Sequence, residues 1–457
     1  MYASYLFDNK KSRIFFVIVF CWVLLSGLFI QKVILVYIFP HMNAGDGILV
    51  GGDSMFFHNL AVDLAMKIHQ EGWSAWTLYP KNQPVAGILA IFYALFIPQP
   101  WVILPWNALL HALAGYFLLK IFLHIFSEPK VAYLASLPFA FFPSAFTWTA
   151  QMHNENYAVL GSVLMLYSAC LTVKNTPKWD WKRILGMIVS GVIGATLLLM
   201  VREYMYEMLF TFFTIFILLY LMVKVIWEWI HHTKILNIFI RLLPLFVFLL
   251  IQTLIFTHRM QPFEAPSVPS QTTTVFAAPS EREQTDFGNA QWQAVTWLPA
   301  KLDEKIHEVI EMRDHQLTLF PNGATNVDAE VEFKSALDVI KYLPRAFQLG
   351  FLSPFPQDWL SNGSKVTSRL MRMVSMVEML IAYSCLLALP YVFWRKIKNP
   401  SLCVFLWICS TMIITYTIGM PNIGTLYRFR YVFFTPLVGL GLSGWVYYFQ
   451  ERKQKKK

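Results

Sequence analysis

Long apolar runs recur along the chain, and each is near the length that a helix needs to cross a bilayer. A transmembrane helix takes about 20 apolar residues, because it rises ~1.5 Å per residue through a hydrocarbon layer ~30 Å thick. Only 14% of the 457 residues are charged, far fewer than in a soluble domain. The sequence therefore predicts an all-α polytopic membrane protein. The expected spans, about ten by this criterion, cover residues 14–39, 101–124, 131–150, 157–173, 184–201, 204–224, 235–257, 374–394, 401–419 and 431–449.

Basic residues predict the orientation of these spans. Positively charged flanks stay in the cytoplasm, so the lysines and arginine at 10–13 place the N-terminus inside. The same rule then keeps inside the basic loops at 120–130, 174–183, 224–241 and 395–398 and the tail at 452–457. We expect a plasma-membrane protein, in the inner membrane if bacterial, with both termini cytoplasmic. The net charge of +10 follows from these loops, so we expect no nucleic-acid partner.

The chain divides into three parts under this topology. Residues 1–257 form an N-terminal membrane module with a first outer loop at 40–100, residues 258–373 form one large outer loop, and residues 374–457 form the C-terminal spans and basic tail. The apolar segment at 82–98 is short and bounded by prolines, which predicts a re-entrant or interfacial helix. Amphipathic helices are predicted at 55–69, 302–317 and 331–348.

Ionisable and other polar residues gather at the expected outer ends of the spans. In the first outer loop Asp53 follows Gly51-Gly52, and glycines allow a sharp turn and close approach to a ligand. Such residues near membrane depth are costly and often mark a site. The other members of the group are His153, Asn154, Glu155 and Asn156 between two spans, Arg202 and Glu203 in a short turn, and Tyr427, Arg428 and Arg430 before the last span.

Each member also has a structural explanation. Asp53 could be a helix N-cap and nothing more, and the turn from His153 to Asn156 could be an ordinary capped turn. Arg202 could form a local salt bridge with Glu203 or Glu207. The arginines at 428 and 430 could extend to lipid headgroups.

Together, carboxylates and arginines on one membrane face suit transfer from a lipid-phosphate donor. Guanidinium groups bind phosphate oxygens well, and a carboxylate can take the proton of an acceptor hydroxyl. A divalent cation, Mg²⁺ or Mn²⁺, could join the two through Asp53 and Glu155.

At these motifs the chain resembles membrane glycosyltransferases of the GT-C superfamily, among them lipid A aminoarabinose transferases, protein O-mannosyltransferases and bacterial polysaccharide-related enzymes. The likeness lies in the first-loop acid, the short helix at Gln83–Gly87, the second polar motif at His153–Asn156, the long outer loop and the ending Gly424–Tyr431. It implies a polyprenyl-phosphate-linked sugar as donor, a lipid or glycan acceptor and an extracytoplasmic site. Asp53 would be the catalytic base or metal-associated acid, and Glu155 the acid of the second motif. Relatives often carry two adjacent acids in the first motif, whereas here Ser54 follows Asp53.

Under this interpretation, Asp53 and Glu155 are the expected catalytic residues. The expected substrate-binding residues are His153, Asn154, Arg202, Glu203, Tyr427, Arg428 and Arg430. Two other functions fit parts of the pattern: a polymerase or ligase of the O-antigen type with a pyrophosphate-linked donor, and a lipid or solute transporter. A transporter would show repeat-related halves and midplane charges, and the sequence has neither.

Overall fold

The computed structural model describes residues 10–50, 53–173, 180–230, 250–255, 292–321, 323, 325–360 and 366–455. Within these ranges the chain is helical and contains no β-strand, as predicted. Eight of the described helices are long and apolar enough to cross a membrane, and a pair bent by 43° can form a ninth span. All nine coincide with expected spans. The remaining one, at 235–257, falls mostly outside the described residues.

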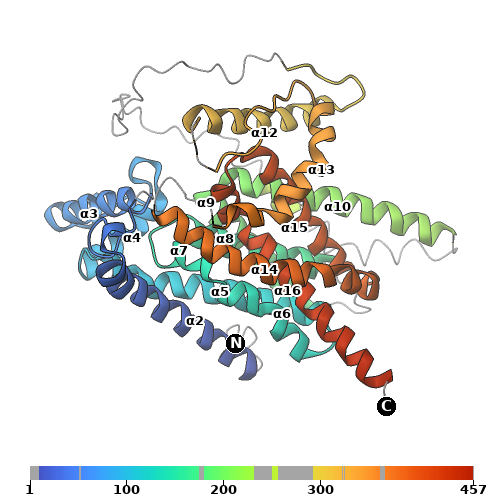
Figure 1. Ribbon diagram of the computed structural model, residues 1–457, viewed down its shortest axis with the longest axis horizontal. Coiled ribbons are helices and arrows are strands. Elements are labelled where there is room, and N and C mark those ends of the chain that lie inside the picture. Colours follow the sequence, from blue (N-terminus) through green and yellow to red (C-terminus); the bar gives the residue numbers. More distant parts are fainter. Residues whose placement is uncertain are drawn as a thin grey trace.

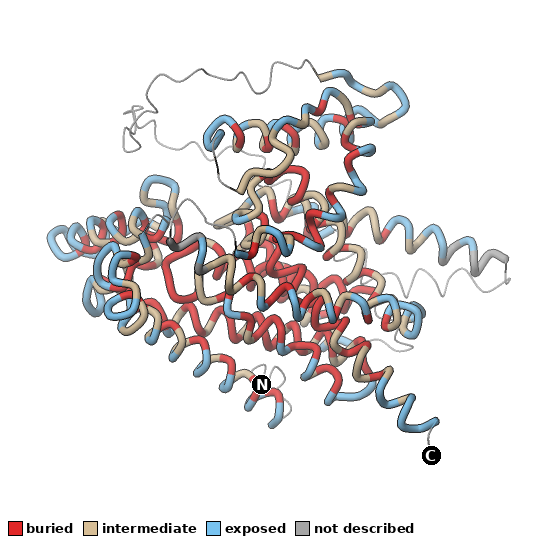
Figure 2. The backbone as a smooth tube through the Cα atoms, viewed as in Figure 1, coloured by how far each residue is buried: buried red, intermediate tan, exposed pale blue. Residues whose placement is uncertain are grey.

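The spanning helices form one bundle (Figure 1). They are α2 (Lys10–Phe29, continued by a π-helical segment, Ile30–Ile38), α5 (Leu104–Ile125), the bent pair α6 (Pro129–Phe141) and α7 (Phe146–Thr149), α8 (Glu155–Val173), α9 (Trp181–Val201), α10 (Glu203–Ile230), α14 (Val366–Lys396), α15 (Pro400–Gly419) and α16 (Ile423–Lys455). Figure 2 shows buried residues concentrated at its centre, around α5, α8, α15 and α16, and exposed residues along α3 and the outer half of α10.

Among the described residues, four α-helices lie outside this set: α3 (Ser54–Glu71), α4 (Pro84–Leu95), α12 (Ala300–Leu319) and α13 (Ala336–Leu352). α4 is apolar but has only 12 residues, in agreement with the short helix expected at 82–98. α3 and α12 agree with the predicted amphipathic helices. α12 and α13 lie on the side of the bundle opposite the labelled chain ends (Figure 1).

The start predicted for the helix at 331–348 is wrong, since α13 begins only at Ala336. Ser335 before it is extended, and the Asp338 carboxylate accepts hydrogen bonds from the Lys334 amide and the Ser335 hydroxyl. The Lys334 carbonyl accepts a bond from the Gln293 amide at 2.8 Å. These local and long-range bonds engage the backbone in a non-helical conformation just before the helix.

α16 packs closely between α6 and α14, and glycines allow the approach. A methyl group on Gly439 would overlap the Ala135 carbonyl oxygen of α6, and one on Gly441 would overlap the Cys385 carbonyl oxygen of α14. Small residues at helix contacts let backbones touch, which supplies much of the packing energy within a membrane. The contact matters because α14 and α16 carry arginines that line the cavity described below.

We expect Gly439→Ala to destabilise the protein, because the clash is with backbone and α6 or α16 must shift. Overpacking of this kind costs about 1–3 kcal/mol. The control is Gly186→Ala on α9, where the new methyl would lie 3.6 Å from a Leu171 methyl carbon, an ordinary contact. The measurement is the thermal unfolding midpoint in detergent. Equal midpoints for the two variants would contradict the close packing of α16.

Candidate functional site

The loop between α7 and α8 is held by buried amide side chains. Gln151 accepts a hydrogen bond from the Leu49 amide and donates to the Gly47 carbonyl, both at 3.0 Å. Asn107 of α5 donates to the carbonyls of Thr149 and Gln151 at 3.0 and 2.8 Å. These bonds satisfy backbone groups that water would not reach in a membrane protein. They also fix the first loop against the turn that carries His153 and Glu155.

Asp53 occupies the N-cap position of α3, but its side chain makes no capping hydrogen bond. The carboxylate is 63% exposed, and one oxygen lies 4.0 Å from Arg428 Nη1. Its neighbour Ser54 is buried and lies 3.1 Å, Oγ to Nε2, from His153. The capping explanation therefore does not account for this carboxylate. Gly51 and Gly52 lie outside the described residues.

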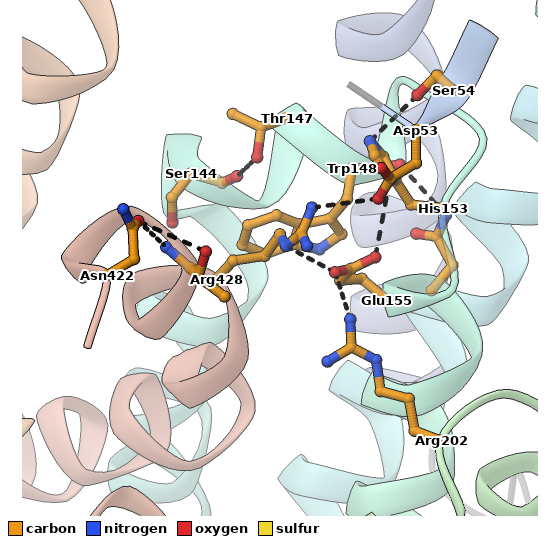
Figure 3. Close-up of polar contacts among 12 residues, drawn as sticks. Asp53, Ser54, Ser144, Thr147, Trp148, His153, Glu155, Arg202, Asn422 and Arg428 are labelled. Atoms are coloured by element: carbon orange, nitrogen blue, oxygen red, sulfur yellow. Dashed lines mark hydrogen bonds and ion pairs between the residues drawn. The ribbon is translucent and has the colours of Figure 1, made fainter. Parts of the chain in front are cut away.

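Glu155, the first residue of α8, is bound by two arginines from distant parts of the chain (Figure 3). Its Oε1 accepts a hydrogen bond from Arg202 Nη2 at 2.6 Å and lies 2.8 Å from Arg428 Nε in an ion pair. The glutamate is only 4% exposed. Arg202 also stacks on the Phe429 ring, 3.8 Å from its centroid. Arg202 thus joins α8 to α16, and Arg428 joins Glu155 to Asp53.

His153 lies beside this cluster, with Nδ1 3.8 Å from Glu155 Oε2. Burial lowers the pKa of His153, and the nearby Glu155 carboxylate opposes that shift only in part. The imidazole is therefore neutral at neutral pH, and the positive charges of the cluster are those of the two arginines. The His153 Nε2 lies in hydrogen-bond contact with the Ser54 hydroxyl.

A cavity of about 460 Å³ opens beside the cluster. Ligand pockets of this kind measure roughly 300–1,000 Å³. Arg428, His153 and Tyr427 line it, together with Arg372 and Ser375 of α14. Its other walls are Leu49, Val50, Ser144, Thr147, Trp148, Thr325, Asn326, Val327, Pro354, Asp358, Met371, Val374, Ile423 and Gly424. Asp53 is not a lining residue, but it lies three residues after Val50 and contacts Arg428, at the edge of the cavity.

Part of the hydrophilic insertion covers this cavity. The Val327 amide donates to the Pro421 carbonyl and the Ile423 amide donates to the Thr325 carbonyl, both at 2.9 Å. Asn422 donates from Nδ2 to Asn326 Oδ1 at 3.0 Å. These bonds tie residues 325–327 to the start of α16, so the insertion forms a fixed wall beside Arg428.

Other expected residues have different surroundings. Tyr427 lines the cavity and donates its hydroxyl to Glu378. Arg430 is fully buried and donates to the Gly350 and Ser353 carbonyls, so it holds the end of α13 and does not reach the cavity. Glu203 is exposed at the start of α10. The Asn154 carbonyl accepts the Ala158 amide of α8, and Asn156 donates to the Trp148 carbonyl at 3.2 Å.

The sequence patterns did not identify Arg372 and Glu378 of α14 as candidate site residues. Glu378 is 1% exposed and accepts hydrogen bonds from the Ser144 amide at 2.6 Å and from Tyr427. An acid within an apolar run is a signal that could have found it. Arg372, at the end of that run, looks like an ordinary charged flank.

The surroundings of Glu155 do not fit a divalent cation. Two guanidinium groups already lie on one of its oxygens, and their charges would repel Mg²⁺ or Mn²⁺. Within the described part of the chain, no three His, Cys, Asp or Glu side chains are grouped to hold a metal. The metal site expected at Asp53 and Glu155 is therefore not supported by the donor set.

Comparisons of the chain with protein-family models, with curated proteins and with solved structures found no match.

We expect Glu155→Gln to lower stability strongly, because it leaves two arginines near a buried amide without their counter-charge. Breaking a buried ion pair from one side costs about 3–5 kcal/mol. The matched control is Glu332→Gln, whose carboxylate is 69% exposed and lies 3.6 Å from an exposed lysine. Surface pairs of that kind contribute about 0–1 kcal/mol. Thermal midpoints measure both, and equal losses would argue against the buried cluster.

Proposed function

We propose that the chain is a GT-C-type membrane glycosyltransferase that transfers a sugar from a polyprenyl-phosphate donor to an acceptor hydroxyl on the extracytoplasmic face. One observation carries the proposal. Arg428, which lines the cavity, lies 2.8 Å from Glu155 and 4.0 Å from Asp53. An arginine and an exposed carboxylate thus lie side by side at one edge of a ligand-sized space.

In the proposed reaction, Asp53 is the general base. It is the exposed acid of the cluster, so an acceptor can reach it without disrupting the buried pairs. The acceptor oxygen attacks the anomeric carbon, its proton passes to the Asp53 carboxylate, and the bond between the anomeric carbon and the phosphate oxygen breaks. Until that proton is transferred, the negative charge of Asp53 stabilises the positive charge that develops on the sugar ring.

The phosphate leaves with the electron pair of the broken bond and gains negative charge. Arg428 and Arg372 both line the cavity, and preorganised cations lower the cost of that charge. Glu155 is a positioning residue here, because it holds Arg428 and Arg202 in place. Its two arginine partners leave it unsuited to act as a second base. The mechanism uses these side chains alone and involves no metal-bound step.

The lining of the cavity also supports a lipid-linked donor. Leu49, Val50, Met371 and Val374 present apolar side chains in the same space as the two arginines. A polyprenyl phosphate combines an apolar chain with an anionic head, and such a mixed lining matches both parts. In this proposal the chain has the predicted topology, with about ten spans and the site on the outer face.

Asp53→Asn should strongly slow transfer while leaving the fold intact, since the carboxylate is exposed and makes no capping bond. Loss of a general base typically costs ~10²–10⁴-fold in rate. The control is Asp63→Asn, an exposed acid further along α3. The measurement is glycosylated product in membranes with matched protein levels, from cells whose own copy has been removed. Product formation by Asp53→Asn at the wild-type rate would remove Asp53 from the mechanism.

A second candidate, a polymerase or ligase using a pyrophosphate-linked donor, is favoured by one observation. Arg372 and Arg428 come from different helices and line the same cavity, which would suit two phosphates.

The lipid that accumulates in cells without the protein distinguishes the two functions. We expect a single sugar on a polyprenyl monophosphate, identified by mass spectrometry of extracted lipids, because the donor is no longer consumed. Wild-type protein should clear it, and Asp53→Asn should not. An oligosaccharide on a pyrophosphate would instead establish the second function.

A further inference from the structure

A second cavity, of about 420 Å³, lies at the far end of the bundle from the candidate site. It is formed where α5 and α14 end and α15 begins. α14 contributes Arg372 to the first cavity and Arg395 to the second. At 1.5 Å per residue these positions are roughly 35 Å apart along the helix, about the thickness of a bilayer core. The two cavities therefore belong to opposite membrane faces.

The second cavity is lined by cations and by no carboxylate. Its lining includes Arg395, Lys396 and Lys398, with the remaining walls made by Leu123, His124, Ile125, Phe126, Ser127 and Asn399. Positive charges crowded in one recess repel each other unless an anion accompanies them. The lining itself supplies no such anion.

Nearby carboxylates neutralise only part of this charge. Glu451 of α16 is engaged by Arg395 and Tyr391, and Glu128 accepts a hydrogen bond from Gln450 at 3.2 Å. Lys398, in contrast, makes no hydrogen bond or ion pair with any residue that the structure describes.

The walls of this cavity are held in place. Asn399 donates from Nδ2 to the His124 and Ile125 carbonyls at 3.3 Å, and its Oδ1 accepts the Ser401 amide at 3.0 Å. These bonds join the end of α5 to the start of α15. Arg395 and Lys396 lie over the Tyr447 ring, 4.6 and 5.7 Å from its centroid. Arg395 and Lys396 are therefore positioned before any ligand arrives, which reduces the entropy lost on binding.

Exposed apolar residues flank the cations at the end of α14 and just after it. Trp394 is 83% exposed, Ile397 46% and Phe393 40%. Aromatic residues next to basic ones are typical of the headgroup region of a membrane. Basic recesses between transmembrane helices at this level bind anionic lipid headgroups.

We propose that this cavity binds the phosphate group of an anionic ligand, and that a phospholipid headgroup supplies it. Arg395, Lys396 and Lys398 would contact the phosphate, and the acyl chains would lie along the exposed apolar residues of α14. This site is separate from the proposed glycosyl transfer and does not depend on it.

The test uses full-length protein reconstituted in phosphatidylcholine with or without phosphatidylglycerol, and reads the thermal unfolding midpoint. The cavity variant is Lys396→Gln with Lys398→Gln. The matched control is Lys453→Gln with Lys455→Gln, which removes the same charge from the exposed end of α16. A third condition adds inorganic phosphate to phosphatidylcholine alone.

Phosphatidylglycerol should raise the midpoint of the wild type and of the tail control alike. The cavity variant should lose most of that rise and bind the lipid on the order of tenfold more weakly, since Lys396 and Lys398 line the same recess as Arg395 whereas the two tail lysines do not. Equal responses of the two double variants, or no response of the wild type, would overturn the proposal. Stabilisation by inorganic phosphate, lost in the cavity variant and not exceeded by phosphatidylglycerol, would support the phosphate site and overturn the lipid as its source.

Discussion

The buried carboxylate of Glu155 is the constraint on which the candidate site depends. Placing it at the start of α8, in surroundings with little water, is costly unless a counter-charge is close. Arg202 and Arg428 supply that charge from two other parts of the chain, at 2.6 and 2.8 Å. Because both cations are needed there, the α9–α10 turn and the start of α16 are drawn to the same point. The ion pair with Glu155 also holds Arg428 where it lines the cavity.

Backbone hydrogen bonding places the remaining parts of the site. The turn before Glu155 is not helical, and in apolar surroundings its amides and carbonyls need other partners. Gln151 and Asn107 provide several of them and in doing so hold the first loop, which leads to Asp53. The same requirement is met at another wall of the cavity, where residues 325–327 form hydrogen bonds with the start of α16. The turn before Glu155 and residues 325–327, for which the sequence predicts no regular structure, are thus held in place by hydrogen bonds.

The fold was largely predictable because the length of an apolar run alone specifies a spanning helix. The shared position of Asp53, Glu155, Arg202 and Arg428 was also predictable, because topology puts them at one end of the bundle. Arg430 does not share the cavity with Arg428 for a physical reason: residues two apart do not share a helix face, so of these two only Arg428 reaches it. Arg372 could not be found, because a charge at a span end has the same pattern whether it faces lipid or a cavity. The start of α13 depends on the distant Gln293, which local propensity does not reveal.

The long, 4.0 Å contact between Arg428 and Asp53 has a kinetic consequence in the proposed reaction. An anion entering the cavity competes with Asp53 for the same guanidinium, and at that separation the existing attraction is weak. Arrival of the donor would therefore uncouple the base from its cation and make its oxygens more available to a hydroxyl. Substrates would then add in a compulsory order, with the donor first. A donor bound without an acceptor would be open to attack by water, and the edge of the cavity would have to limit that hydrolysis.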